Sequence, residues 1–153
     1  MGLRKILTDK EPALHKVCKP VASFDKKLHK LLDDMIDTLI DSGGVGLAAP
    51  QVGILRRVVL VDVGMEEPDI IELINPEMLE TDGEQYGPEG CLSVPGKYGL
   101  VRRPNYAKVR AQDRNGTQPR CYRTTYSVTT CTRCDYENIE EISAAYTVCC
   151  PND

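Results

Sequence analysis

One strongly amphipathic segment, residues 23–40, most limits the folds open to this chain. Its apolar residues recur at intervals of three and four, with Lys and Asp between them, and Gly43-Gly44 follows as a stop. These apolar residues are Leu28, Leu31, Leu32, Met35, Ile36, Leu39 and Ile40. The pattern predicts a helix that buries one face against the rest of the protein.

Runs of β-branched residues follow this helix. Residues 56–64, R-R-V-V-L-V-D-V-G, predict a buried strand, and residues 70–76, I-I-E-L-I-N-P, predict a second strand that ends at Pro76. Residues 106–116 alternate apolar and polar up to Asn115-Gly116, the pair that best fits a two-residue type I′ hairpin turn. A hairpin is therefore expected here.

The segments after this turn complete the predicted order of elements. Residues 121–130 have the propensity of a returning strand, and residues 135–148 predict a short helix capped by Asp135. The order helix, strands, hairpin and short helix predicts the α+β class.

The length of 153 residues suits one domain, 1–153, with one active site. A net charge of -4 gives no electrostatic footprint for nucleic acid. The sequence contains neither a secretory signal nor a membrane-spanning segment, so we expect a cytoplasmic protein with no membrane partner.

Composition changes near Gly116. Residues 117–153 contain no Leu, Lys or Gly, yet they hold five of the seven cysteines and many threonines. Without a secretory signal, free thiols or metal ligands are expected there before disulfides. The chain thus divides into residues 1–116 and a Cys/Thr-rich tail, 117–153.

Two short motifs carry the chemistry. In G-V-G-L-A-A-P-Q, residues 44–51, small residues let a ligand backbone approach, and the Gln51 amide can donate to a carbonyl oxygen. The alternative is a plain helix stop followed by a loop. In E-G-C-L-S, residues 89–93, Cys91 stands in a Gly- and Pro-rich frame, and a lone loop cysteine is usually a small buried hydrophobe. Each motif alone leaves these alternatives open.

Together the two motifs resemble the first two signature motifs of peptide deformylases, metal-dependent hydrolases that remove the formyl group from the N-terminal methionine of new proteins. The similarity runs from about Leu7 to Gly116 and includes I-N-P at 74–76 and V-R-R-P at 101–104. It implies a peptide-deformylase-like α+β fold with mixed or antiparallel strands. It also implies N-formyl-methionyl nascent peptides as substrate, at the ribosome.

The resemblance also assigns roles to individual residues. Cys91 matches the thiolate ligand of the catalytic metal, Fe(2+) or Zn(2+). Gln51 and the backbone N–H of Leu92 match the donors that stabilise the oxyanion formed from the formyl oxygen.

Further matches concern the peptide. Val45 and Gly46 correspond to the edge that pairs with the substrate backbone, Gly90 to a neighbouring substrate contact, and Tyr98 to the lining of the methionine pocket. Glu89 and Arg103 resemble an ion pair that braces the cysteine segment; as two exposed charges, they would contribute little.

The third family motif, H-E-x-x-H on a C-terminal helix, is absent. The chain has only His15 and His29, both before the first motif, and each is expected at the surface on or near the first helix. By this resemblance, the chain lacks two of the metal ligands and the Glu general base, so we predict that it has no deformylase activity.

Three hypotheses account for the missing motif. The reading frame changed just after Gly116; or the tail is authentic and the protein is a non-catalytic binding relative of the deformylases; or thiolates replace the imidazoles. In the last case Cys91 joins Cys131 and Cys134, with Cys149 or Cys150 as fourth ligand, in a structural zinc site.

Overall fold

The computed structural model describes residues 2–64, 66–117, 120–124, 128–129 and 143–144. The helices are α1 (Lys26–Ser42) and two short 3-10 helices, η1 (Pro12–His15) and η2 (Ala49–Val52). The strands are β1 (Gly46–Ala48), β2 (Val58–Asp62), β3 (Ile70–Asp82), β4 (Gln85–Cys91), β5 (Val94–Arg103), β6 (Tyr106–Gln112), β7 (Arg120–Thr124), β8 (Val128–Thr129) and β9 (Ser143–Ala144). The named strands pair antiparallel, which confirms the α+β class.

Helix α1 confirms the amphipathic prediction and starts and ends two to three residues later than predicted. The Asp25 carboxylate caps it by accepting hydrogen bonds from the N–H groups of Lys27 at 2.9 Å and Leu28 at 3.0 Å. The bond from Leu28 is the largest cause that lowers the pKa of Asp25. Gly43 ends the helix with a φ of 64°, which glycine adopts without strain.

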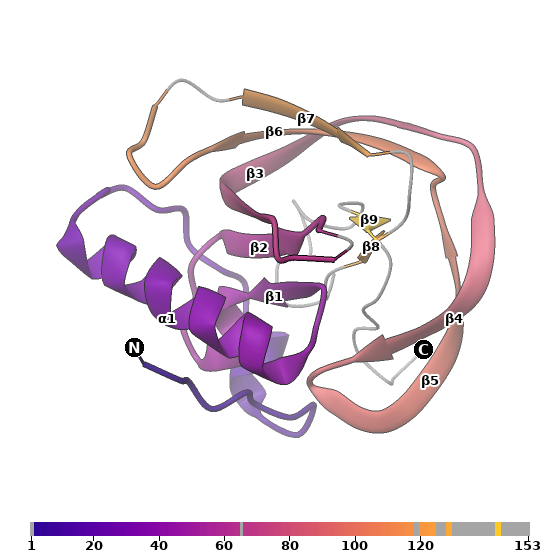
Figure 1. The fold of residues 1–153 in the computed structure, drawn as a ribbon, viewed down its shortest axis with the longest axis horizontal. Coiled ribbons are helices and arrows are strands. Elements are labelled where there is room, and N and C mark those ends of the chain that lie inside the picture. The colour runs from indigo at the N-terminus through magenta and orange to yellow at the C-terminus, as the bar shows by residue number, and fades with distance from the viewer. Residues whose placement is uncertain (1, 65, 118–119, 125–127, 130–142, 145–153) are drawn as a thin grey trace.

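Five strands form a sheet in the order β1-β2-β3-β6-β7, and α1 lies across one of its faces (Figure 1). β2 is buried on both faces, because its alternate side chains enter two different clusters. Val58 and Leu60 pack with α1, whereas Val59 and Val61 pack on the opposite face with residues such as Val109. The apolar run of β2 therefore reflects a two-sided core.

The second predicted strand does not end at Pro76, since β3 continues to Asp82. A β-bulge accommodates Pro76 within the strand: the register shifts between Ile74 and Glu77, and Asn75 has a φ of 50°. The Asn75 side chain accepts from Val21 N at 2.8 Å and donates to Val21 O at 2.9 Å. This pairing stabilises the unusual backbone and lets the strand pass through a residue that normally ends one.

The two-residue turn predicted at Asn115-Gly116 is wrong. β6 and β7 are joined by residues 113–119, in which Gly116 N donates to Asp113 O at 3.0 Å. This bond closes a turn over residues 113–116, and among residues 113–117, which the structure describes, only Gly116 has a positive φ. Asp at the first position and Gly at the last are typical of a type I turn.

The C-terminal predictions are only partly described. β7 confirms the start of the predicted returning strand, while Val128 and Thr129 pair with β9 instead. Of the helix predicted over residues 135–148, only Ser143 and Ala144 are described, and they form a strand. The remainder of that segment lies outside the described residues, so the expected loss of the family's metal-bearing helix stays a prediction.

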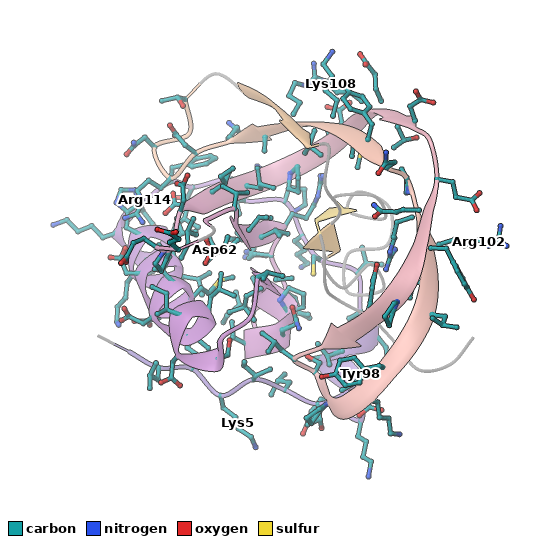
Figure 2. The ribbon with its side chains drawn as sticks, turned by 45° about the vertical axis from the view of Figure 1, so that its right-hand side comes forward. Lys5, Asp62, Tyr98, Arg102, Lys108 and Arg114 are labelled. Carbon is teal, nitrogen blue, oxygen red and sulfur yellow. The ribbon has the colours of Figure 1, made fainter. Side chains whose placement is uncertain are left out.

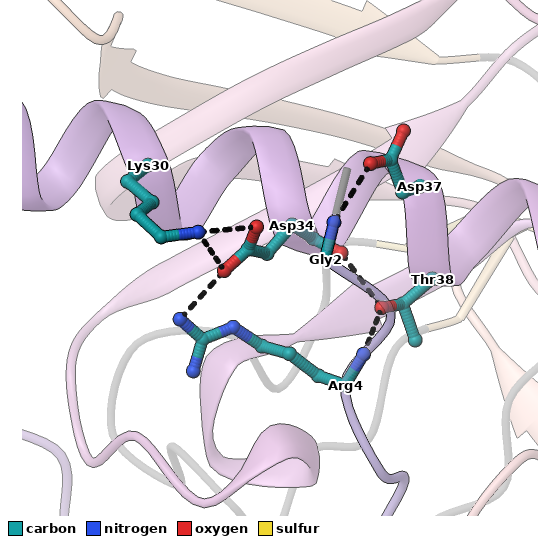
Figure 3. Close-up of polar contacts among 6 residues, drawn as sticks. All are labelled: Gly2, Arg4, Lys30, Asp34, Asp37 and Thr38. Atoms are coloured by element: carbon teal, nitrogen blue, oxygen red, sulfur yellow. Dashed lines mark hydrogen bonds and ion pairs between the residues drawn. The ribbon is translucent and has the colours of Figure 1, made fainter.

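The N-terminal segment runs along α1 (Figure 3). Arg4 donates to the carboxylate of Asp34 at 2.9 Å and, through its backbone N–H, to Thr38 Oγ1 at 2.9 Å. Lys30 and Arg4, in that order, lower the pKa of Asp34.

Within the described residues, no helix is both long and apolar enough to cross a membrane.

Candidate functional site

Cys91 is the last residue of β4 and not part of a loop, contrary to the sequence interpretation. A two-residue turn, Leu92–Ser93, connects it to β5. Cys91 is 8% exposed, and Ser93 N–H donates to its Sγ at 3.4 Å. The sulfur therefore lies at the turn end of the β4–β5 hairpin, where a backbone N–H donates to it.

The hairpin bulges beside the cysteine. Gly90 pairs with Tyr98 and Cys91 with Val94, so residues 95–97 have no partner on β4, and Gly96 has a φ of 76°. The Tyr98 ring covers Gly90, because a Cβ at Gly90 would lie 3.1 Å from that ring. Tyr98 itself is 81% exposed and lies near the turn end of the β4–β5 ribbon (Figure 2).

Gln51 is fully buried beside Cys91, and its amide makes three contacts. Oε1 accepts from Ala48 N–H at 2.9 Å, which also fixes the orientation of the amide. Nε2 donates to Ser93 Oγ at 3.1 Å and faces Cys91 Sγ at 4.0 Å. As the third residue of η2, Gln51 binds back to the N-cap, which explains locally why this side chain points inward.

The N-terminal segment ties the two motifs together. Leu7 N–H donates to Gln51 O at 2.7 Å, and Asp9 N–H donates to Ser93 O at 2.9 Å. Gln51 and Ser93 are thus linked both through their side chains and through one shared backbone segment. This double link fixes Gln51 next to the cysteine although 40 residues separate them in sequence.

A pocket of about 450 Å³ opens between the motifs. One wall consists of residues 43–46 and the other of residues 90–92 and 94–98. Leu92 approaches Gly44 so closely that a Cβ at Gly44 would lie 2.7 Å from the Leu92 side chain. The small residues of the first motif therefore make room for the second.

The structure places the residues predicted for peptide contact at this pocket. Val45, Gly46, Gly90 and Tyr98 all line it, together with Cys91 and Leu92. β1 is the first strand of its sheet and, among the described residues, pairs only with β2. The other edge of β1 is the kind of edge to which an extended peptide can add.

Glu89 and Arg103 form the predicted ion pair, but the expectation of two exposed charges is wrong. Their side chains are only 10% and 11% exposed, and the closest N–O distance is 3.5 Å. The pair connects β4 to β5 two residues before Cys91. Loss of one partner would leave the other charge buried, which costs far more than breaking a surface pair.

The metal ligand set is incomplete in the described part of the chain. His15 contacts Asp9 O at 3.0 Å and is exposed; His29 contacts Arg114 O at 2.8 Å and is half-buried. Neither lines the pocket. Among the described residues, no three His, Cys, Asp or Glu gather to hold an ion. These residues do not fit a catalytic metal, while Cys131 and Cys134 lie outside them.

The sequence predicted no role for Ser93, yet this residue contacts both Gln51 and Cys91. Ser93 is 1% exposed, its hydroxyl holds Gln51 and its N–H faces the thiol. Residues 95–97, which project into the pocket wall, were also missed. The Pro95-Gly96 pair within a strand was the signal for the bulge.

A small α+β domain with a buried Cys and Gln, a pocket of about 450 Å³ and a strand edge beside it has the features of a peptide-binding or peptide-processing class of protein. The comparisons are more specific. The family model described as polypeptide deformylase matches residues 3–130. The chain belongs to the peptide deformylase family, which removes the N-formyl group from nascent proteins and is metal-dependent.

Individual relatives agree. A peptide deformylase of Lachnoclostridium phytofermentans is 54% identical over 115 residues, covering 75% of this chain and 71% of the relative. Peptide deformylase 1 of Bacillus subtilis is 52% identical over 116 residues, covering 76% and 72%. The crystal structure of a Legionella pneumophila peptide deformylase superposes with a TM-score of 0.77 at 42% identity, covering 80% of this chain and 72% of that one.

Proposed function

We propose that this chain binds the formylated N-terminus of a nascent protein in the pocket beside Cys91 and, as written, does not hydrolyse the formyl group. The observation that carries the proposal is that both motifs line one pocket whereas both histidines lie outside it. Nascent formylated chains emerge from ribosomes in the cytoplasm, so binding would take place there.

The pocket offers each part of such a ligand a matching group. The free edge of β1 suits an extended backbone, and Tyr98 offers an aromatic surface for a methionine side chain. Gln51 does not itself line the pocket, but its Nε2 faces Cys91 Sγ at 4.0 Å, and in this proposal a formyl oxygen beside Cys91 replaces that weak contact with a stronger hydrogen bond. Leu92 N–H is the second donor in this proposal.

Hydrolysis needs groups that the sequence does not supply. A hydrolytic metal site takes about three protein ligands and a base that removes a proton from water. Whichever metal bound Cys91, iron or zinc, the H-E-x-x-H ligands and base would be missing, because the chain has only His15 and His29.

Binding and turnover are separable by measurement. Calorimetry with a formyl-methionyl tripeptide and a formate-release assay would be run on the same protein, with Fe(2+) or Zn(2+) added. We expect saturable binding without formate, and weaker binding of the unformylated peptide. Formate release that Cys91→Ser abolishes would refute the proposal, as would equal affinity for both peptides.

The origin of the tail needs a separate experiment. The loss of Leu, Lys and Gly after Gly116 supports a changed reading frame. If resequencing the coding DNA reveals H-E-x-x-H in another frame, the intended protein is a deformylase with Cys91 as ligand. If it does not, one zinc per chain that is lost with Cys131→Ser would instead favour the zinc-thiolate alternative.

A further inference from the structure

A second, larger groove of about 770 Å³ lies away from the cysteine pocket, and the two share no lining residue. Its apolar wall consists mainly of Val21, Leu28, Leu31 and Ile54. Val21, Leu28 and Leu31 belong to the hydrophobic core and Ile54 packs against it, so the core holds this wall in place. The volume falls within the roughly 300–1,000 Å³ typical of small-molecule sites.

The rim of this groove is basic although the whole chain carries a net charge of -4. Four lining residues are cationic, namely Arg4, Lys19, Lys27 and Arg56, whereas Asp25 is the one acidic residue. Arg4 is already paired with Asp34 at 2.9 Å (Figure 3). Asp25 caps α1 and interacts with the neighbouring Lys27. Lys19 and Arg56 thus remain as the cations available to a ligand.

The backbone holds Lys19 and Arg56 side by side. They form an isolated parallel bridge, in which Lys19 N–H donates to Leu55 O at 3.1 Å and Arg57 N–H donates to Lys19 O at 3.0 Å. Both residues are exposed, so the bridge sets two like charges on neighbouring backbone positions at the rim of the groove. Among the described residues, no carboxylate forms an ion pair with either of them.

We propose that this groove binds a small amphiphile with an anionic head group and an unbranched apolar chain. The head group lies at the bridged cations Lys19 and Arg56, whose positive charges it neutralises, and the chain lies on the apolar wall. A carboxylate and a phosphate share this chemistry. The site is separate from the formyl-peptide pocket and does not depend on its function.

The test uses the full chain and calorimetry with four probes below their micelle concentrations: decanoate, decyl phosphate, decyltrimethylammonium and acetate. We expect one decanoate or decyl phosphate per chain, and the tighter of the two identifies the preferred head group. Decyltrimethylammonium and acetate lack, respectively, the anion and the chain, so we expect neither to bind measurably. Equal binding of the cationic amphiphile, or no binding of either anion, would overturn the proposal.

A pair of charge-matched variants locates the site. The double variant Lys19→Gln/Arg56→Gln should weaken binding of the anionic amphiphile about tenfold, because two exposed charges each contribute modestly to binding an anion. Lys10→Gln/Lys16→Gln removes the same charge from exposed positions outside the groove and should leave the affinity unchanged. Equal affinities of the two variants would refute the location. Competition by a saturating formyl-methionyl peptide would refute the separateness of the two sites.

Discussion

The replacement Gln51→Leu tests whether the hydrogen bonds around Cys91 hold the two motifs together. The substitution replaces a fully buried amide side chain with an apolar side chain of similar size. It leaves Ala48 N–H and the Ser93 hydroxyl without the partners they have at 2.9 and 3.1 Å. Both residues are 1% exposed, so water does not readily replace the lost partner.

The expected loss follows from these two groups. An unsatisfied buried polar group costs about 1–3 kcal/mol, so two cost about 4 kcal/mol, and a buried leucine regains roughly 1 kcal/mol. We therefore expect the free energy of unfolding to fall by about 3 kcal/mol. For a chain of this size the midpoint of thermal unfolding should drop by roughly 10 °C.

Urea unfolding of both proteins measures this difference directly, provided that the denaturant slope is unchanged. Gln85→Leu is the matched control, because Gln85 is only half-buried and donates one hydrogen bond, to Pro104 O at 2.8 Å. That variant should lose less than about 1 kcal/mol. If Gln51→Leu is no more destabilising than Gln85→Leu, the network does not hold the motifs, and the reasoning fails.

Two further perturbations follow from the packing and charge of the same half of the chain. Gly44→Val forces a side chain into Leu92, so it should weaken formyl-peptide binding severalfold, measured by calorimetry, and lower the free energy of unfolding by about 1–3 kcal/mol, measured by urea unfolding. In the control Gly87→Ala the added methyl group meets open space, so neither quantity should change. Equal effects of the two variants would contradict the packing argument. The lowered pKa of Asp34 means that its stabilisation is present above the unfolded pKa and is lost as pH falls through the folded value. Urea midpoints should therefore drop less between neutral and acid pH in Asp34→Asn than in the exposed control Asp41→Asn, and equal drops would contradict this prediction.

Elements with a strong periodic pattern could be predicted from the sequence. The seven apolar residues of α1 and the β-branched run of β2 gave the helix and the central strand directly. β4 and β5 were missed, because Gly and Pro occur throughout them and one face of the ribbon is exposed. The turn at Asn115-Gly116 was predicted wrongly for a different reason: the Asp113 carboxylate, which accepts from Asn115 N–H at 2.9 Å, favours a turn over residues 113–116, one residue earlier than predicted.

The candidate site could be located from its two motifs but not built from them. Cys91, Gln51 and the pocket residues came from the resemblance, and the structure brings them together. The burial of the Glu89–Arg103 ion pair and the link through Ser93 depend on which face of the β4–β5 hairpin points toward the protein interior. That orientation depends on long-range packing, which a local pattern does not report.

Under the proposed function, the arrangement of residues 2–117 would allow peptide binding to persist without catalysis. The pocket walls, Gln51 and Ser93 are held by one another and by the N-terminal residues Leu7 and Asp9, all of which precede residue 117. In the family the metal ligands on the third motif belong to a later segment, so a change confined to that segment removes the means of activating water while leaving these contacts in place. Under the proposed function, the groups that would bind the formyl peptide all precede residue 117, whereas of the family's metal ligands and base only the cysteine, Cys91, does.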